Sequence, residues 1–222
     1  MSRNKVDYNA IDPSAFYVKR KPVYYFFKRF FDITISFLVI IIFSWLFILL
    51  WVLVKCTSKG PGIYVSDRVG KDGKVFKFYK FRSMKVDAEQ ELESLMQHNE
   101  TGGITFKMKG DPRITKFGKI LRKTSLDELP QFFNILKGDM SIVGPRPCTT
   151  REYQLYSERD KLRLLVPQGL TGYWQIHGRS NTSFEEMMKL DLKYICERRG
   201  FFYDIWLIIR TPFKLFTHGA AE

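Results

Sequence analysis

The chain has 222 residues and is 45% hydrophobic, which suffices for one domain with a sizeable core but not for two. Lys and Arg total 36 against 23 Asp and Glu, and this surplus of 13 favours an anionic partner: nucleic acid, phospholipid headgroups or a phosphorylated substrate. The three cysteines lie far apart without a CxxC or Cys/His cluster, which argues against a zinc site and favours a reducing environment.

An uncharged, apolar segment follows a short N-terminal arm. No charged residue occurs between Asp32 and Lys55, and residues 33–54 are long enough to cross the hydrocarbon core of a bilayer as a helix. We therefore predict a membrane-inserted helix over residues 28–56, behind a basic arm over residues 1–27.

Basic residues flank both ends of this segment. They are Lys19, Arg20, Lys21, Lys28 and Arg29 before it, and Lys55, Lys59, Arg68 and Lys71 after it. Because basic residues stay on the cytoplasmic side of a membrane, both ends are expected in the cytoplasm, and a re-entrant helix that breaks near Ser44 satisfies this rule. An ordinary single span with the N-terminal arm outside is the alternative.

Two strand-like stretches, residues 63–69 and 74–81, flank the sequence Gly-Lys-Asp-Gly at 70–73. The Asp-Gly turn predicts a β-hairpin. Its second strand mixes aromatic and basic residues, a pattern that suits nucleic acid, anionic headgroups or a phosphorylated substrate. The membrane segment favours the last two.

Three further stretches have helical patterns. An acidic one at 87–97 predicts a solvent-facing helix, and another spans residues 184–198. The aromatic stretch at 201–216, which Pro212 interrupts, suits either a helix lying on the membrane surface or a plain core helix. The predicted fold class is α+β and predominantly helical, with a membrane-embedded re-entrant N-terminal helix and a compact cytosolic domain over residues 57–222 that contains a small β-hairpin.

Asp127 and Glu128 form the most informative acidic pair in the chain. Ser125, three residues before Glu128, makes a capping box at a helix start a sufficient explanation for them. An active site is the alternative, because Pro130 interrupts backbone pairing and many cations lie nearby in sequence. These cations are Arg113, Lys116, Lys119, Arg122, Lys123 and Arg146. Carboxylates among clustered Arg and Lys suit magnesium-assisted phosphoryl chemistry, and the stiff Gly-Pro-Arg-Pro sequence can hold Arg146 as a phosphate clamp.

Five sequence blocks carry a family resemblance. They are KRFFD at 28–32, KFYKFRSM at 77–84, TSLDELPQFFNILKGDMSIVGPRP at 124–147, PQGLTGYWQIHGR at 167–179 and LDLKY at 190–194. In this order they resemble the bacterial sugar transferases, or monotopic phosphoglycosyl transferases, which start the assembly of lipid-linked glycans. The resemblance runs from about Lys28 to the C-terminus. It implies an enzyme of the bacterial cytoplasmic (inner) membrane whose catalytic domain lies on the cytoplasmic face.

The resemblance also implies a two-step, ping-pong transfer. The residue matching Asp127 attacks the sugar-linked phosphate of a nucleotide sugar, expected to be a UDP-sugar, releases UMP and becomes an aspartyl phosphosugar, which polyprenyl (undecaprenyl) phosphate then takes. A Mg2+ ion is expected at Asp127 and Glu128. Carried over by position, the substrate-binding candidates are Lys80, Arg122 and Arg146 for phosphate and Gln175, Arg179 and Asp191 for the nucleotide-sugar pocket. Ordinary structural hydrogen bonding explains Gln175 and Asp191 equally well.

The family's membrane helix is described as a re-entrant hairpin, and many members break it with Ser-Pro. Here Trp45 follows Ser44, so a bend would rest on local backbone hydrogen bonding by Ser44, which is a weaker device. Two other classes of protein compete with a transferase: a non-enzymatic basic membrane anchor that recruits a partner protein, and an RNA-binding protein. The apolar segment argues against nucleic acid as a partner, membrane phospholipids are expected neighbours, and self-association stays open.

Overall fold

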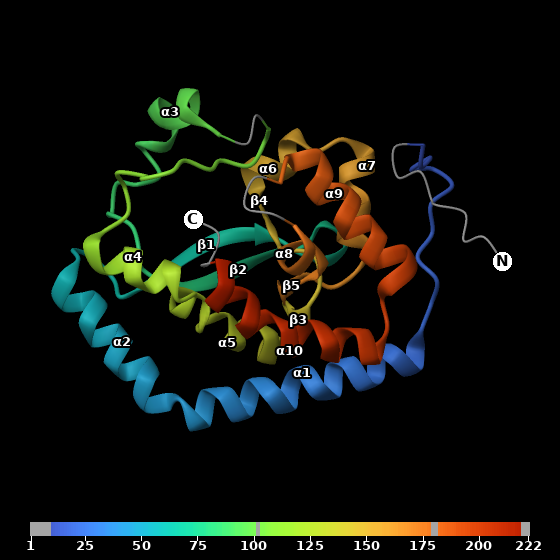
Figure 1. Ribbon diagram of the computed structural model, residues 1–222, viewed down its shortest axis with the longest axis horizontal. Helices are drawn as coiled ribbons and strands as arrows, with labels where there is room; N and C mark the ends of the chain where they lie inside the picture. Colours follow the sequence, from blue (N-terminus) through green and yellow to red (C-terminus); the bar gives the residue numbers. More distant parts are fainter. Residues whose placement is uncertain (1–9, 101–102, 179–181, 219–222) are drawn as a thin grey trace.

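Two apolar helices meet at a sharp bend near the start of the chain. In the computed structural model, which describes residues 10–100, 103–178 and 182–218, α1 (Pro22–Ile42) and α2 (Ser44–Thr57) make an angle of 65° (Figure 1). Within these residues no helix is by itself long and apolar enough to cross a membrane, whereas the bent pair together is. The break falls at Phe43, beside Ser44, so the predicted break point is confirmed.

Helix α1 lies along the body of the protein and is attached to it by polar contacts from the KRFFD block. Lys28 Nζ lies 2.7 Å from the Asp204 carboxylate, and both side chains are buried. Arg29 donates to the carbonyl oxygens of Ile135 and Leu136, which lie near the C-terminal end of α5 (Gln131–Lys137). These contacts fix the direction in which α1 leaves the body.

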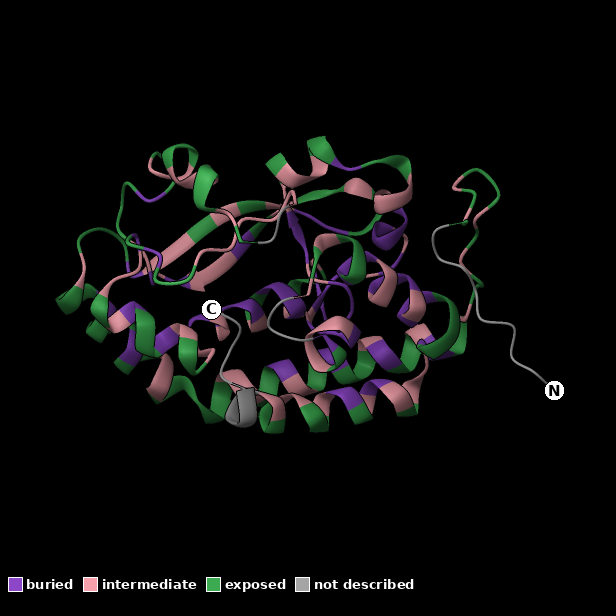
Figure 2. Ribbon diagram, turned by 45° about the horizontal axis from the view of Figure 1, so that its top comes forward, coloured by how far each residue is buried: buried purple, intermediate pink, exposed green. Residues whose placement is uncertain are grey.

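The remaining surface of the bent pair carries apolar side chains that nothing in the described chain covers. Most of the outward face of α1 and α2 is exposed (Figure 2). Large exposed residues on it include Phe26, Phe37, Ile42, Trp45 and Ile48. An apolar surface of this extent is typical of a segment that contacts lipid or another protein.

The predicted hairpin is confirmed. Strands β1 (Ile63–Val69) and β2 (Val75–Phe81) pair antiparallel, with Ile63 opposite Phe81. The turn between them places Asp72 at a φ of 57° and Gly73 at 76°, the left-handed conformation that Asp and Gly tolerate. A third strand, β4 (Cys148–Thr149), pairs antiparallel with the end of β1. A second, two-stranded sheet joins β3 (Ser141–Val143) and β5 (Gly169–Thr171) in parallel.

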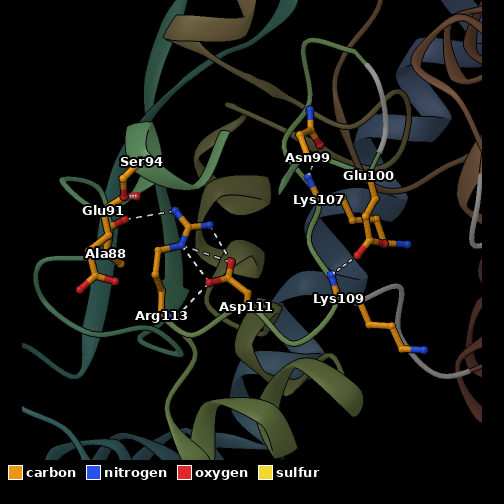
Figure 3. Close-up of polar contacts among 9 residues, drawn as sticks. All are labelled: Ala88, Glu91, Ser94, Asn99, Glu100, Lys107, Lys109, Asp111 and Arg113. Carbon is orange, nitrogen blue, oxygen red and sulfur yellow. Dashed lines mark hydrogen bonds and ion pairs between the residues drawn. The ribbon is translucent and has the colours of Figure 1, made fainter. Parts of the chain in front are cut away.

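A long segment connects β2 to α4 (Lys116–Lys123), and a buried ion pair closes its base. Arg113 Nη2 lies 2.6 Å from the Asp111 carboxylate, while Nη1 donates to the Ala88 carbonyl oxygen (Figure 3). The acidic helix predicted at 87–97 is shorter than expected, because only α3 (Leu92–Leu95) and a 3-10 turn (Met96–His98) are helical. No residue of α3 is buried, so tertiary packing does not extend this helix.

The other helices surround the two small sheets (Figure 1). They are α4 (Lys116–Lys123), α6 (Thr150–Leu155), α7 (Glu158–Lys161), α8 (Tyr173–His177), α9 (Phe184–Lys193) and α10 (Phe201–His218), and a π-helical turn (Tyr194–Arg198) extends α9. In α10, Leu207 is fully buried whereas Phe202 is 85% exposed, so this helix packs on the core with one face and presents apolar residues on the other. The fold is α+β and mostly helical, as predicted.

Candidate active site

Asp127 and Glu128 lie in a short 3-10 turn (Leu126–Glu128) between α4 and α5. Ser125 precedes this turn with a φ of 56°, and its side chain makes no capping hydrogen bond. The predicted capping box is therefore wrong, since the left-handed backbone at Ser125 ends α4 and turns the chain sharply. Pro130, at the N-cap of α5, separates the acid pair from the helix that follows.

Lys80 contacts both carboxylates from the end of β2, one residue before the strand ends. Its Nζ lies 2.7 Å from Glu128 Oε1 and 3.5 Å from Asp127 Oδ2. All three side chains are largely buried, so these charges interact in surroundings that screen them poorly. Sequence reasoning expected Lys80 to be near phosphate, and the structure brings it to the acid pair.

Arg146 reaches the same pair from the loop between β3 and β4. Its Nη2 donates to Glu128 Oε1 at 2.7 Å. The loop is packed tightly against β5, because a Cβ atom added at Gly144 would lie 2.2 Å from the Pro167 carbonyl oxygen. A second backbone contact, from the Gly169 amide to the Pro145 carbonyl oxygen, holds the loop at 2.8 Å. The guanidinium is therefore presented from a rigid loop, as the Gly-Pro-Arg-Pro sequence predicts.

Burial and charge act differently on the two carboxylates. Burial raises the pKa of Asp127 above its ordinary value, because it outweighs the attraction of Lys80 and the neighbouring Glu128 charge adds to the rise. Burial also opposes ionisation of Glu128, but the charges of Arg146 and Lys80 outweigh it and hold the pKa of Glu128 well below its usual range. Neighbouring acids whose pKa values are pushed apart are suited to different roles. Glu128 is therefore the more easily ionised of the two acids, and Asp127 is the more basic oxygen donor.

The acid pair fits one kind of metal site. Magnesium prefers oxygen ligands and usually takes one or two carboxylates together with phosphate oxygens and water. Asp127 and Glu128 supply two neighbouring carboxylates, and within the described part of the chain no three His, Cys, Asp or Glu side chains are grouped to hold a metal. The donor set therefore fits a magnesium ion that shares the oxygens of a bound phosphate.

The other predicted site residues are placed differently. Arg122 lies on α4 and is half-buried. Burial, Lys80 and Glu128 have the larger effects on the pKa of Asp127, and the charge of Arg122 also lowers it. Gln175, on α8, has a buried amide group whose nitrogen and oxygen both lack a hydrogen-bond partner in the described chain. Arg179 lies outside the described residues. Pocket roles for Gln175 and Arg179 stay predictions.

Asp191 is connected to the Arg146 loop through Arg163. It is buried in α9, where its carboxylate lies 2.6 Å from Arg163 Nη2. The same Arg163 nitrogen donates to the Arg146 carbonyl oxygen at 2.9 Å. The structure thus gives Asp191 a structural partner, and its predicted part in the nucleotide-sugar pocket stays a prediction.

Arg163 is a site residue that the sequence analysis missed. It lies in the stretch Leu162–Leu165, a short 3-10 helix in which it is the only charged residue, and its side chain is buried. A lone arginine inside an apolar run signals a buried guanidinium that must find acceptors. That signal could have identified Arg163, although not its contact with Arg146.

The sequence profile of the family described as bacterial sugar transferase matches residues 23–218. The chain is 50% identical over 184 residues to the galactosyl transferase CpsE of Streptococcus agalactiae serotype III, which covers 82% of this chain and 40% of that protein. It is 41% identical over 202 residues to the UDP-glucose:undecaprenyl-phosphate glucose-1-phosphate transferase of Escherichia coli K12, covering 87% of this chain and 41% of that protein.

A third relative is similar to this chain over most of its own length. The exopolysaccharide production protein ExoY of Rhizobium meliloti is 39% identical over 188 residues, which cover 83% of each protein. The chain thus spans about two fifths of the length of the CpsE and E. coli relatives and most of the length of ExoY. The chain belongs to the bacterial sugar transferase family.

Proposed function

We propose that this chain transfers a sugar 1-phosphate from a UDP-sugar to undecaprenyl phosphate and so begins the assembly of a lipid-linked glycan. The observation that carries the proposal is the buried Asp127–Glu128 pair between two fixed cations, Lys80 and Arg146. The substrates follow from the name of the E. coli relative, a UDP-glucose:undecaprenyl-phosphate glucose-1-phosphate transferase.

In the first step an oxygen of Asp127 attacks the phosphorus of the sugar-linked phosphate. The bond from that phosphorus to the oxygen bridging the two phosphates breaks, the electron pair leaves with UMP, and an aspartyl phosphosugar remains. The raised pKa of Asp127 makes its carboxylate a better nucleophile than an ordinary aspartate. Lys80 and Arg146 are already positioned to stabilise charge on the phosphoryl oxygens.

In the second step an oxygen of polyprenyl phosphate attacks the same phosphorus. The bond from phosphorus to Asp127 breaks, the carboxylate is regenerated, and the product is a polyprenyl diphosphate sugar. Glu128 stays ionised throughout, because Arg146 and Lys80 stabilise its charge. A magnesium ion held by Asp127 and Glu128 would neutralise phosphate charge in both steps.

An open apolar groove of about 610 Å³ beside the acid pair offers a place for the lipid chain of the acceptor. Its residues come from α2, from the hairpin, and from α5 together with its N-cap residue: Phe47, Ile48, Trp51, Ile63, Tyr79, Phe81, Pro130, Phe133 and Lys137. Pro130 lies two residues after Glu128, so the groove begins next to the reacting groups. A prenyl chain in this groove would bring its phosphate toward Asp127.

The proposal includes a re-entrant arrangement of the bent helix pair at the cytoplasmic face of the bacterial inner membrane. The 65° bend and the exposed apolar face of α1 and α2 support it, as do the basic residues at both ends. This arrangement keeps the acid pair on the side from which UDP-sugars arrive while the groove opens beside α2, at the lipid.

The test uses protein solubilised in detergent, with magnesium, undecaprenyl phosphate and a panel of UDP-sugars. We expect at least one UDP-sugar to yield UMP and a polyprenyl diphosphate sugar. Asp127→Asn keeps the size of the side chain and is expected to abolish turnover, whereas a membrane anchor would be unaffected by it. The proposal fails if no UDP-sugar releases UMP.

A further inference from the structure

Arg68 lies on the face of the hairpin that carries Lys80. In the antiparallel register Arg68 is opposite Phe76, and Tyr64 is opposite Lys80, so side chains of alternate residues share this face. Arg68 and Lys80 both contact the Phe78 ring, with the guanidinium carbon 5.2 Å and Nζ 5.7 Å from its centroid. Arg68 thus extends the row of cations away from the acid pair along the strands.

Arg68 is also joined to the loop that presents Arg146. Its Nη1 donates to the Pro147 carbonyl oxygen at 3.4 Å. The chain then continues directly into β4, where Thr149 lies opposite Arg68 in the sheet. The two guanidinium groups therefore belong to one connected surface, formed by the end of β1 and the Gly-Pro-Arg-Pro loop.

Arg68 differs from its neighbouring cations in having no carboxylate partner. Lys80 and Arg146 pair with Glu128, and Arg163 pairs with Asp191, whereas in the described chain no carboxylate oxygen lies within 4.0 Å of Arg68. Its Nε is buried without a hydrogen-bond partner. A guanidinium with one long hydrogen bond and no counter-charge is costly to bury unless a ligand supplies the missing acceptors.

The electrostatics of Arg68 agree with this reading. Burial lowers the pKa of Arg68 below the ordinary arginine value, and the positive charge of Arg146 adds to the effect. Glu152 acts in the opposite direction, but its carboxylate accepts from the Thr149 amide at 2.7 Å as part of a capping box at the start of α6. An anion between Arg68 and Arg146 would relieve the repulsion between them.

We propose that Arg68 binds the nucleotide-side phosphate of the sugar donor, the phosphate that leaves with UMP. This inference rests on the proposed function, in which the sugar-linked phosphate lies at Asp127 beside Lys80 and Arg146. A nucleoside diphosphate sugar carries its second phosphate one bridging oxygen farther on, and Arg68 is the cation that the Phe78 ring and the Pro147 carbonyl oxygen place beside Lys80 and the Arg146 loop. A planar guanidinium can meet two phosphate oxygens at once.

Measuring the rates of the two half-reactions separately distinguishes phosphate binding by Arg68 from a general structural role. In Arg68→Gln, we expect UMP release from UDP-sugar to fall about ten- to a hundredfold in kcat/KM, the effect of losing a hydrogen bond to a charged group. The inhibition constant for UMP should rise by a similar factor. Once the aspartyl phosphosugar has formed, its transfer to undecaprenyl phosphate should proceed at the unmodified rate, because the nucleotide phosphate has gone. Arg68→Lys keeps the charge, so its kcat/KM for UMP release should lie between those of the unmodified protein and Arg68→Gln.

Lys77→Gln is the matched control, because it removes one positive charge from the opposite face of the same hairpin, where Lys77 pairs with Asp67 in solvent. Thermal unfolding of each variant shows whether it is folded. The inference is overturned if Arg68→Gln leaves UMP inhibition unchanged, or if it slows both half-reactions equally. If the proposed function is wrong, the unmodified protein releases no UMP, which is a different result. In that case Arg68 is still tested by comparing the affinity for UMP of Asp127→Asn with that of the double variant Asp127→Asn, Arg68→Gln.

Discussion

At the acid pair, two neighbouring carboxylates experience nearly the same burial and respond in opposite ways. Lys80 and Arg146 both contact Glu128 Oε1, whereas among the described residues the cation contact of Asp127 is the longer one of 3.5 Å with Lys80. Small differences in distance to a cation decide which acid stays ionised, because charges interact strongly where water is excluded. These contacts distinguish Asp127, the proposed nucleophile, from the more easily ionised Glu128.

The raised pKa of Asp127 predicts the acidic limb of the pH profile. Asp127 must be ionised to attack, so UMP release should decline with falling pH at values above the ordinary aspartate pKa of 3.8. Because the Lys80 charge lowers the pKa of Asp127, Lys80→Met should move this limb to higher pH and reduce the rate at pH 7 by at least about a hundredfold.

Single-turnover measurements of UMP release across pH check this prediction. Lys77→Met, which removes an exposed cation from the other face of the hairpin, should leave the limb in place. An acidic limb that stays where it is in Lys80→Met, or that moves to lower pH, would contradict the electrostatic account of Asp127.

Residue identity alone predicted only part of this site. The motif blocks indicated Lys80, Asp127, Glu128 and Arg146, and the structure brings these four together. The Ser-x-x-Glu pattern suggested a helix cap, but the same residues also suit the 3-10 turn that forms here. Only the left-handed backbone at Ser125 distinguishes the two. The position of Arg68 depends on how β4 pairs with β1, and no local pattern near Arg68 encodes that pairing.

Among the helices, the buried contact between α1 and α10 determines how the bent pair of α1 and α2 is held. Asp204 accepts hydrogen bonds from Lys28, Tyr24 and Tyr194, so three elements converge on one carboxylate. The KRFFD block was recognised in the sequence as a motif, but its role is to anchor α1. That role could not be predicted, because its partner Asp204 lies far along the chain.

Removing one partner of this buried network should destabilise the protein strongly. Lys28→Met leaves the Asp204 carboxylate without its counter-charge and should lower the free energy of unfolding by about 3–5 kcal/mol. Adding Asp204→Leu removes the unpaired charge and should recover part of the loss. Thermal unfolding in detergent measures both, with the exposed Lys19→Met as control. Equal stability of Lys28→Met and Lys19→Met would argue against the anchor.

Other elements followed from local pattern. The hairpin, the break beside Ser44 and the helix that begins at Phe184 were predicted from turn residues, an uncharged run and helical periodicity. The acidic stretch at 87–97 was predicted too long, because periodicity does not reveal whether a helix has a core to pack against.

At the scale of the whole molecule, the proposed function places the nucleotide sugar at Lys80 and Arg146 and the lipid acceptor in the apolar groove beside α2. Ile48 lines the apolar groove and is 66% exposed, whereas Ile41, on α1, is 54% exposed and does not line it. Substitutions at Ile48 and Ile41 therefore distinguish binding of the acceptor chain in the groove from general contact with lipid.

Ile48→Asn should raise the KM for undecaprenyl phosphate by about ten- to a hundredfold, because burying an isoleucine against an apolar chain contributes about 1.5–3 kcal/mol. UMP release in the first half-reaction should be unchanged. Ile41→Asn places the same polar group on the bent pair outside the groove and should leave the KM unaltered. Similar effects of both substitutions on the KM would count against the groove as the acceptor site.

The central claim is that Asp127 carries the phosphosugar, and intact-protein mass spectrometry tests it most directly. Incubated with a UDP-sugar in the absence of acceptor, the protein should gain the mass of one sugar phosphate, located by digestion to the peptide that contains Asp127. Undecaprenyl phosphate should discharge the adduct, and Asp127→Asn should never form it. UMP release with no adduct, or an adduct that persists in Asp127→Asn, would contradict the account.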